Sequence, residues 1–237
     1  MKSYVVAALS AALGFGPIAA SHAATLNMDV TADNQFDVYV SSSDSVLGTL
    51  VLSGNAWGTT YSASVTVPGG ADFIHVIAIN WTSDNGYSYG SGTPPSGGNP
   101  GAFIGTFSIS GGAFSNGATA LSTDTTHWTA NPATPAGSPP WSPTDLPGWA
   151  APTGAPVSYG LNGVAPWGDV QSVSSSAQWL WPTQNPDYPY NYDYAEFSTT
   201  FIAAPEPAAW MMISLGFAAL GFAAVRRSGK QALPIEG

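Results

Sequence analysis

Residues 26–40 read LNMDVTADNQFDVYV. Apolar residues alternate with polar ones at 26–30 and again at 36–40, and residues 31–35 between them are polar turn formers. Alternation of this kind is typical of strands that bury only one face. The stretch therefore predicts two short strands joined by a turn, at the start of an antiparallel sheet.

The same pattern recurs along the chain. Further strands are expected at 48–52, 61–67, 73–80, 103–109, 170–173, 177–181 and 195–202. Turn residues at 54–55 and 68–70 and a long loop at 83–100 separate them, and no helical periodicity intervenes. Short strands at intervals of about ten residues predict an all-β fold, an antiparallel β-sandwich with long loops.

Residues 111–169 are dense in Gly and Pro, which is typical of loops, but they also contain tryptophans. These are Trp128, Trp141, Trp149 and Trp167. Because disordered linkers lack aromatic residues, we expect this segment to fold back onto the sandwich and cover an apolar edge.

All fixed positive charge lies at the two ends of the chain, at Lys2, Arg226, Arg227 and Lys230. Residues 24–204 hold eleven Asp and one Glu, a formal charge near −12. Nucleic-acid binding is excluded, since phosphate neutralisation needs Lys or Arg. Neutral sugars, cations or other proteins are the expected partners. The chain has no cysteine, which excludes disulfides, thiolate metal sites and Cys nucleophiles.

The first 23 residues have the features of a secretory signal. Lys2 supplies a positive start, residues 5–20 are apolar, and Ser21-His22-Ala23 places small residues where a signal peptidase cleaves. We expect residues 1–23 to be a signal peptide and 24–204 to be the exported domain.

The C-terminus carries three features in order: Pro205-Glu206-Pro207, an uncharged apolar stretch at 208–225, and a basic cluster at 226–230 that includes Arg226 and Arg227. The apolar stretch is long enough for one transmembrane helix. Positive charge resists translocation, so residues 231–237 are expected to be a cytoplasmic tail.

Together these three features resemble the PEP-CTERM sorting signal of Gram-negative bacteria. The resemblance implies a partner, an exosortase, which recognises Pro205-Glu206-Pro207 and removes the helix at 208–225. It also implies residence at the inner membrane during sorting and then at the cell surface or in the extracellular polysaccharide matrix.

The domain resembles the galactose-binding-like (discoidin-type) jelly rolls found beside bacterial glycosidases. The stretches that carry this resemblance are 32–40, Trp57, 70–80, 100–105, 123–128, 165–168, 177–181 and 195–201. Two positions depart from the pattern, because residues 41–45 replace an Asn-Gly hairpin and no basic residue lies near Ser198. The resemblance implies a jelly-roll sandwich and carbohydrate binding.

Two groups of aromatic and polar residues are candidates for ligand binding. One follows the strand at 73–80 and comprises Trp81, Asp84, Asn85, Tyr87, Tyr89 and Asn99. The other comprises Asp187, Tyr190, Tyr192 and Asp193. Aromatic faces stack on sugar rings while carboxylates and amides bond the hydroxyls. The alternative for each group is that the tyrosines pack loops onto the sandwich.

No catalytic residue is predicted. Residues 86–90 match G-x-S-x-G, but the prolines and turn formers after them rule out the helix that a nucleophile elbow needs. His75 and His127 lack metal-ligand spacing and are expected to be structural. No cofactor is expected. Calcium is the ion that loop acids would suit, and its weak candidates are Asp33, Asp37, Asp44 and Asp84.

These observations predict an exported, non-enzymatic protein that binds carbohydrate or associates with an extracellular matrix. Two alternatives stay open. One is a surface glycan hydrolase, because two of the acids would need to lie only about 5–10 Å apart. The other is a purely structural matrix protein.

Overall fold

In a computed structural model, the chain divides into two compact units. The structure describes residues 24–67, 72–81, 101–133, 146–182, 192–203, 215–218 and 220. One unit spans Ala23–Ala204 and contains every described strand. The other comprises Met1–His22 and Pro205–Gly237, of which only a short helical stretch at 215–218 and 220 is described.

The described strands of the larger unit all pair antiparallel. In chain order they are β1 (Ala24–Asp33), β2 (Gln35–Ser41), β3 (Thr49–Gly54), β4 (Tyr61–Val67), β5 (Phe73–Trp81), β6 (Ala102–Ser110), β7 (Gly112–Phe114), β8 (Ala120–Ser122), β9 (Thr129–Ala133), β10 (Pro156–Leu161), β11 (Gln178–Pro182) and β12 (Tyr192–Ala203).

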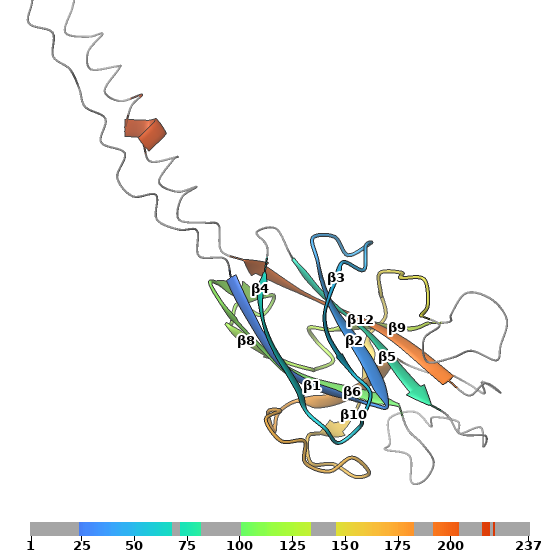
Figure 1. The fold of residues 1–237 in the computed structure, drawn as a ribbon. Helices are drawn as coiled ribbons and strands as arrows, with labels where there is room; N and C mark the ends of the chain where they lie inside the picture. Colours follow the sequence, from blue (N-terminus) through green and yellow to red (C-terminus); the bar gives the residue numbers. More distant parts are fainter. Residues whose placement is uncertain are drawn as a thin grey trace, which may run out of the picture. The chain divides into compact units, whose positions relative to one another are not determined.

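These strands form two sheets that pack face to face (Figure 1). Sheet A has the order β10-β11-β6-β1-β4, with β8 also beside β6. Sheet B has the order β3-β2-β5-β12-β7, with β9 also beside β12. The structure therefore confirms the all-β, antiparallel sandwich that the alternating pattern predicts.

The core lies between the two sheets. Along β1, Leu26, Met28 and Val30 are buried, while Asn27 and Asp29 between them face outward. From sheet B the buried partners include Val38 of β2. Large aromatic residues fill the centre of the core at Phe103, Phe107, Trp128, Trp181 and Phe197. This closed core lies wholly within residues 24–203, so we expect the larger unit to fold without the two ends.

The opening stretch 26–40 folds differently from its prediction. Its two segments are strands, but they do not pair with each other: β1 lies in sheet A and β2 lies in sheet B, with only Asn34 between them. The corner between the sheets is therefore at Asn34, and residues 31–33 continue β1 rather than forming a turn. The alternation predicts a strand correctly but carries no information on which strand it pairs with.

Most of the other expected strands are present, and two regions differ. Residues 170–173 are turns rather than a strand, and residues 111–169 contain β7, β8, β9 and β10 instead of loop alone. β7 and β8 have only three residues each, and β7, β9 and β10 carry Gly112, Pro132 and Pro156, which mask the alternating pattern.

The tryptophan-rich segment does fold onto the sandwich in its described part. Trp128 is buried in the core, Trp167 is buried against sheet A, and Trp149 packs on the outer face of sheet B. Trp141 lies outside the described residues. The expectation that these side chains anchor the segment is confirmed for three of the four tryptophans.

Both outer faces of the sandwich are partly covered. On sheet B, Tyr39, Ile77, Ile79 and Tyr194 form a second buried cluster, against which Leu47, Ala133 and Trp149 pack. On sheet A, the segment 162–177 is held by a bond from the Ser174 N–H to Thr106 Oγ1 at 2.8 Å. It is also held by Thr60, which donates to the Gln171 carbonyl at 2.5 Å.

Within the residues that the structure describes, no helix is both long and apolar enough to cross a membrane. The predicted span at 208–225 is described only at 215–218 and 220, where Leu215, Phe217 and Leu220 are exposed. The signal at 1–23, the basic cluster at 226–230 and the tail at 231–237 lie outside the described residues.

Candidate ligand-binding end of the sandwich

Strands from both sheets begin or end together at one end of the sandwich. β1 ends at Asp33, which pairs with Ala102 at the start of β6, and β2 begins at Gln35, which pairs with Ile79 near the end of β5. β9 ends at Ala133 beside Tyr194. We call this the loop-bearing end, because the segments 82–100, 134–145 and 183–191 are attached to it.

Backbone register brings the described members of the two predicted aromatic groups together at this end. Trp81 closes β5 and pairs with Tyr192, which opens β12, while Asp193 pairs with Asn80. Residues remote in sequence are thus brought together as neighbours. The remaining members lie outside the described residues: Asp84, Asn85, Tyr87, Tyr89, Asn99, Asp187 and Tyr190.

Gly101 shows how tightly the two sheets meet at this end. A Cβ added there would lie 2.8 Å from Cζ2 of Trp181 and 2.9 Å from the Cβ of Asn80. No side chain fits in that space, so glycine is required where the chain returns from residue 100 into β6. The sequence shows a glycine at this place, but nothing in it indicates the close approach.

Asp33 is a buried acid at the same end. Its Oδ2 accepts a hydrogen bond from Nε1 of Trp167 at 3.1 Å, and only 6% of the residue is exposed. Its Oδ1 has no hydrogen-bond partner among the described residues. Burial raises the pKa of Asp33 to about 6, although the bond from Trp167 acts in the opposite direction.

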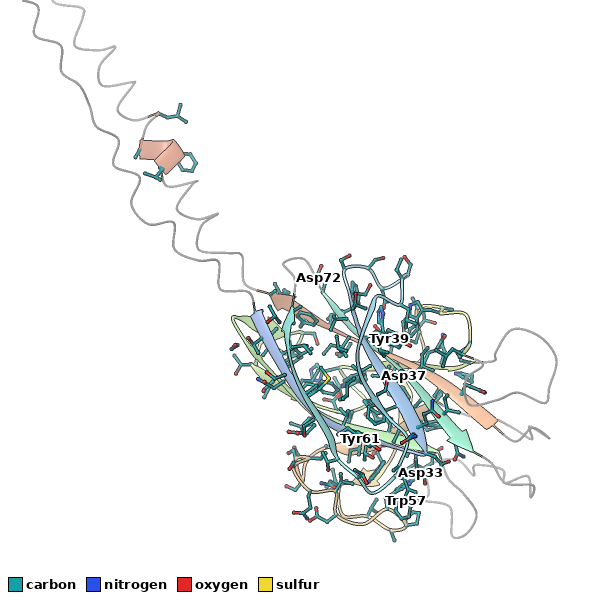
Figure 2. All side chains as sticks on the ribbon, in the orientation of Figure 1. Asp33, Asp37, Tyr39, Trp57, Tyr61 and Asp72 are labelled. Carbon is teal, nitrogen blue, oxygen red and sulfur yellow. The ribbon has the colours of Figure 1, made fainter. Side chains whose placement is uncertain are left out.

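One exposed aromatic residue at this end is missing from the predicted groups. Trp57, between β3 and β4, is 52% exposed. Figure 2 shows it at the same end of the sandwich as Asp33, with Asp72 at the opposite end. A lone tryptophan in the loop 55–60, which is otherwise small and polar, is the signal that would have found it.

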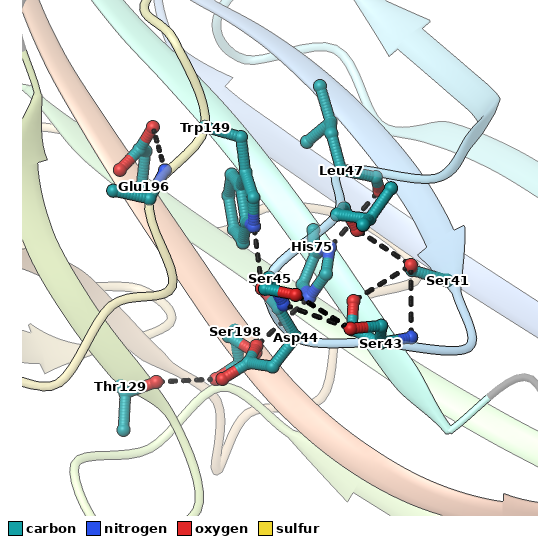
Figure 3. A network of polar contacts seen from close by, with 12 residues as sticks. Ser41, Ser43, Asp44, Ser45, Leu47, His75, Thr129, Trp149, Glu196 and Ser198 are labelled. Atoms are coloured by element: carbon teal, nitrogen blue, oxygen red, sulfur yellow. Dashed lines mark hydrogen bonds and ion pairs between the residues drawn. The ribbon is translucent and has the colours of Figure 1, made fainter.

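A polar network pins the loop between β2 and β3 onto the outer face of sheet B (Figure 3). Asp44 Oδ1 accepts from Ser198 at 2.7 Å and contacts His75 Nε2 at 3.1 Å, and the Asp44 carbonyl accepts from Trp149 at 2.7 Å. The other nitrogen of His75, Nδ1, lies 3.1 Å from the Leu47 carbonyl. Asp44 thus ties three parts of the chain together.

This network contains Ser, His and Asp but not in the order that activates a nucleophile. In such a triad the histidine lies between the serine and the acid, whereas here Asp44 lies between Ser198 and His75. His75 is fully buried, and burial lowers its pKa despite the bonds to Leu47 and Asp44. The arrangement therefore positions a loop, as the structural interpretation of His75 predicts.

His127 also has a local structural role. Its Nδ1 lies 2.8 Å from Asp124 Oδ2, while Asp124 Oδ1 accepts from the backbone N–H groups of Thr126 and His127, both at 2.7 Å. The His127 carbonyl accepts from Thr199 at 2.8 Å. These bonds hold the turn that leads into β9 against β12.

Glu196 is a second buried acid, on the outer face of sheet B. It lies between Ile77 and Asn131 in register and is 2% exposed. Among the described residues, the Ala150 N–H donates to its Oε1 at 3.4 Å. Burial raises the pKa of Glu196 to about 7, and the Ala150 N–H only partly offsets this.

The acids named as calcium candidates are not gathered into one site. Asp33 bonds Trp167, Asp44 belongs to the His75 network, and Asp37 accepts from Ser53 at 2.5 Å. Asp84 lies outside the described residues. In the part of the chain that the structure describes, no three His, Asp or Glu side chains come together as metal ligands.

The sorting residues Pro205, Glu206, Pro207, Arg226 and Arg227 lie outside the described residues. Comparison of the chain with protein-family models, with curated proteins and with solved structures finds no match. The interpretation of the loop-bearing end therefore depends on the chain's own residues and geometry.

Proposed function

We propose that this chain is an exported, non-enzymatic protein of the bacterial surface or extracellular matrix, and that its sandwich binds neutral carbohydrate at the loop-bearing end. The observation that carries the proposal is the pairing of Trp81 with Tyr192. It places Trp81 of one predicted group beside Tyr192 of the other, although the two residues lie far apart in the sequence.

The chemistry of this end suits a sugar. Tryptophan and tyrosine offer apolar faces for the carbon side of a pyranose, and Asp and Asn side chains bond its hydroxyls. Residues 24–204 carry no Lys or Arg, so an anionic polymer would be repelled, whereas a neutral one would not. Loops at the end of a rigid sandwich are a common place for such a site.

The ends of the chain support export. Residues 1–23 have the composition of a signal peptide, and Pro205-Glu206-Pro207, the apolar stretch 208–225 and Arg226-Arg227 have the order of an exosortase sorting signal. We propose that the helix is a transient membrane anchor and that an exosortase removes it. The compact unit Ala23–Ala204 lies between these two signals.

The finer fold is proposed to be a galactose-binding-like jelly roll. Support comes from connections that repeatedly pass from one sheet to the other, at β1–β2, β3–β4, β4–β5, β5–β6 and β11–β12. A jelly roll has this kind of winding between two antiparallel sheets.

The test measures co-sedimentation of the unit Ala23–Ala204 with neutral polysaccharide purified from the producing cells. Trp81→Ala and Tyr192→Ala are each expected to weaken binding about tenfold or more, because aromatic anchors dominate such contacts. Trp57→Ala tests whether the exposed tryptophan belongs to the same site.

Ile202→Ala is the matched control. Ile202 lies on β12, as Tyr192 does, but at the other end of the strand, and it is 67% exposed. Its removal should leave binding unchanged. Wild-type protein that does not sediment with the polysaccharide, or equal losses for Tyr192→Ala and Ile202→Ala, would contradict a carbohydrate site at the loop-bearing end.

A further inference from the structure

β4 forms the edge of sheet A and is open to another strand. It pairs with β1 along its whole length, and within the described residues its backbone has no hydrogen-bond partner on the other side. Alternate residues of an edge strand point their N–H and C=O groups outward, where they can pair with a further strand.

β4 has none of the features that usually keep edge strands from pairing. It has the sequence YSASVTV, without charge, proline or an irregularity in its register with β1. β3, the edge of sheet B on the same side, also lacks charge and proline. Natural proteins commonly protect exposed edges with lysine, proline or bulges.

The carboxylates beside β3 and β4 accept hydrogen bonds from hydroxyl groups of these two strands. Ser62 of β4 donates to Asp29 Oδ1 on β1 at 2.5 Å, and Ser53 of β3 donates to Asp37 Oδ1 on β2 at 2.5 Å. Residues 45–71 contain no charged residue and no histidine. In a domain with a formal charge near −12, this side is where two copies can approach with little repulsion.

The side chains of β4 are complementary to themselves. Ser62, Ser64 and Thr66 are exposed on one face, and Tyr61, Ala63 and Val65 are half-buried on the other. Two copies paired antiparallel around a twofold axis would place hydroxyl residues beside hydroxyl residues and apolar residues beside apolar residues. An uncharged strand offers no attraction that would select a cationic or anionic partner instead.

We propose that β4 pairs with β4 of a second copy of this chain, which joins two A sheets into one continuous sheet. This interface adds self-association to the carbohydrate binding proposed above and does not depend on it. Two loop-bearing ends held in one dimer would raise the apparent affinity for a repeating polymer by bivalent attachment.

The test measures the oligomeric state of the unit Ala23–Ala204 by sedimentation velocity over a range of concentrations, without carbohydrate. Wild type is expected to dimerise reversibly. Ser64→Lys should raise the dissociation constant of the dimer roughly tenfold, because it brings two ammonium groups together where the two β4 strands meet.

Ala120→Lys is the matched control. Ala120 is exposed on β8 and lies in the same cross-strand row as Ser64, through Asn27 and Ser108. It adds the same charge away from β4 and should leave the dimer intact. Melting temperatures of the two variants will show that both are folded. A wild type that stays monomeric, or equal weakening by both variants, would overturn the proposal.

Cysteine substitution provides a second measurement, since the chain has no cysteine of its own. Opposed residues in an antiparallel pair lie about 4.5–5.5 Å apart at Cα, within disulfide range. Among Ser62→Cys, Ser64→Cys and Thr66→Cys, the position nearest the twofold axis should crosslink to its own copy far better than the other two. Equal crosslinking of all three and of Ala120→Cys would indicate random collision and contradict the proposal.

Discussion

The two sides of the sandwich are built differently. On the β9 and β10 side, the edges are short or interrupted: β9 contains Pro132, β10 begins at Pro156, and its register with β11 shifts between Ser158 and Leu161. On the β3 and β4 side, β4 is continuous and free of proline and charge. The first side is protected against pairing and the second is not.

The covering segments show the same difference. The long connections before and after β10 carry Trp149 and Trp167, which pack onto the outer faces of the two sheets. The segment after β10 reaches Thr60, just before β4, which donates to the Gln171 carbonyl. Along β4 itself, Ser62, Ser64 and Thr66 are exposed. We infer that the covered side supplies stability and that the open side supplies association.

The largest expected effect is on the covered side. Trp167 is buried, stacks on Trp179 with ring centroids 4.7 Å apart, and donates to Asp33. Trp167→Ala should lower the free energy of unfolding by about 3–5 kcal/mol, the usual cost of removing a buried tryptophan. Chemical denaturation followed by fluorescence measures it.

Trp57→Ala is the comparison for that experiment, because Trp57 is 52% exposed. Its effect should stay within about 0.5 kcal/mol, as for most surface substitutions. A loss below 1 kcal/mol for Trp167→Ala, by the same denaturation, would show that the covering segment contributes little to stability.

An intermediate effect is expected from the loop pin. Asp44→Ala leaves His75 and Ser198 without their shared acceptor, and His75 is fully buried. The expected loss is about 1–3 kcal/mol, the cost of an unsatisfied buried polar group. Asp44→Asn keeps one side-chain oxygen and should lose less. Equal losses in thermal unfolding would show that packing, rather than these hydrogen bonds, holds the loop.

The last expected effect depends on pH. The pKa of Glu196 is raised from 4.5 to about 7 in the folded protein, so between these values the folded state retains a proton that the unfolded chain releases. This carboxyl therefore makes the protein more stable as pH falls from about 7 toward 4.5, and less stable as pH rises. The contribution is at most about 3 kcal/mol.

Glu196→Gln should remove that part of the pH dependence. Asp33, whose pKa is raised to about 6, acts in the same direction, and His75, whose pKa is lowered, acts in the opposite direction below its usual value of 6.5. The difference in melting temperature between wild type and Glu196→Gln, measured across the pH range, gives the contribution of Glu196. An unchanged pH profile would show that burial does not raise the pKa of Glu196 in the folded protein.

The sequence predicts the strands better than it predicts their partners. The segments 61–67 and 73–80 are both found as predicted. Residues 61–67 alternate because only one face is buried, whereas 73–80 form an almost continuous apolar run because both faces are buried. The separation of β1 and β2 into opposite sheets is not encoded locally, since it depends on pairing with β6 and β5. In 111–169, β7 and β8 are too short to show a period, and Pro132 and Pro156 interrupt it in β9 and β10.

The sequence also predicts the candidate site only in part. The aromatic and acidic composition identifies Trp81 and Tyr192 as members of two separate groups, but only the register of β5 with β12 makes them neighbours. The sequence predicts Asp33 only as a weak calcium candidate in or beside a loop; the structure shows a buried carboxyl at the end of β1 that accepts a hydrogen bond from Trp167, 134 residues away. A contact between residues so far apart in the chain leaves no recognisable pattern in the sequence around either of them.

The central claim is that the sandwich resides outside the cell after both ends are removed. Intact-mass spectrometry of the chain recovered from the surface of exosortase-bearing cells tests it most directly. We predict a species that begins at Ala24 and lacks residues 208–225, and we predict that Glu206→Ala keeps them. Recovery of a wild-type chain that retains residues 1–23 or 208–225 would contradict the account.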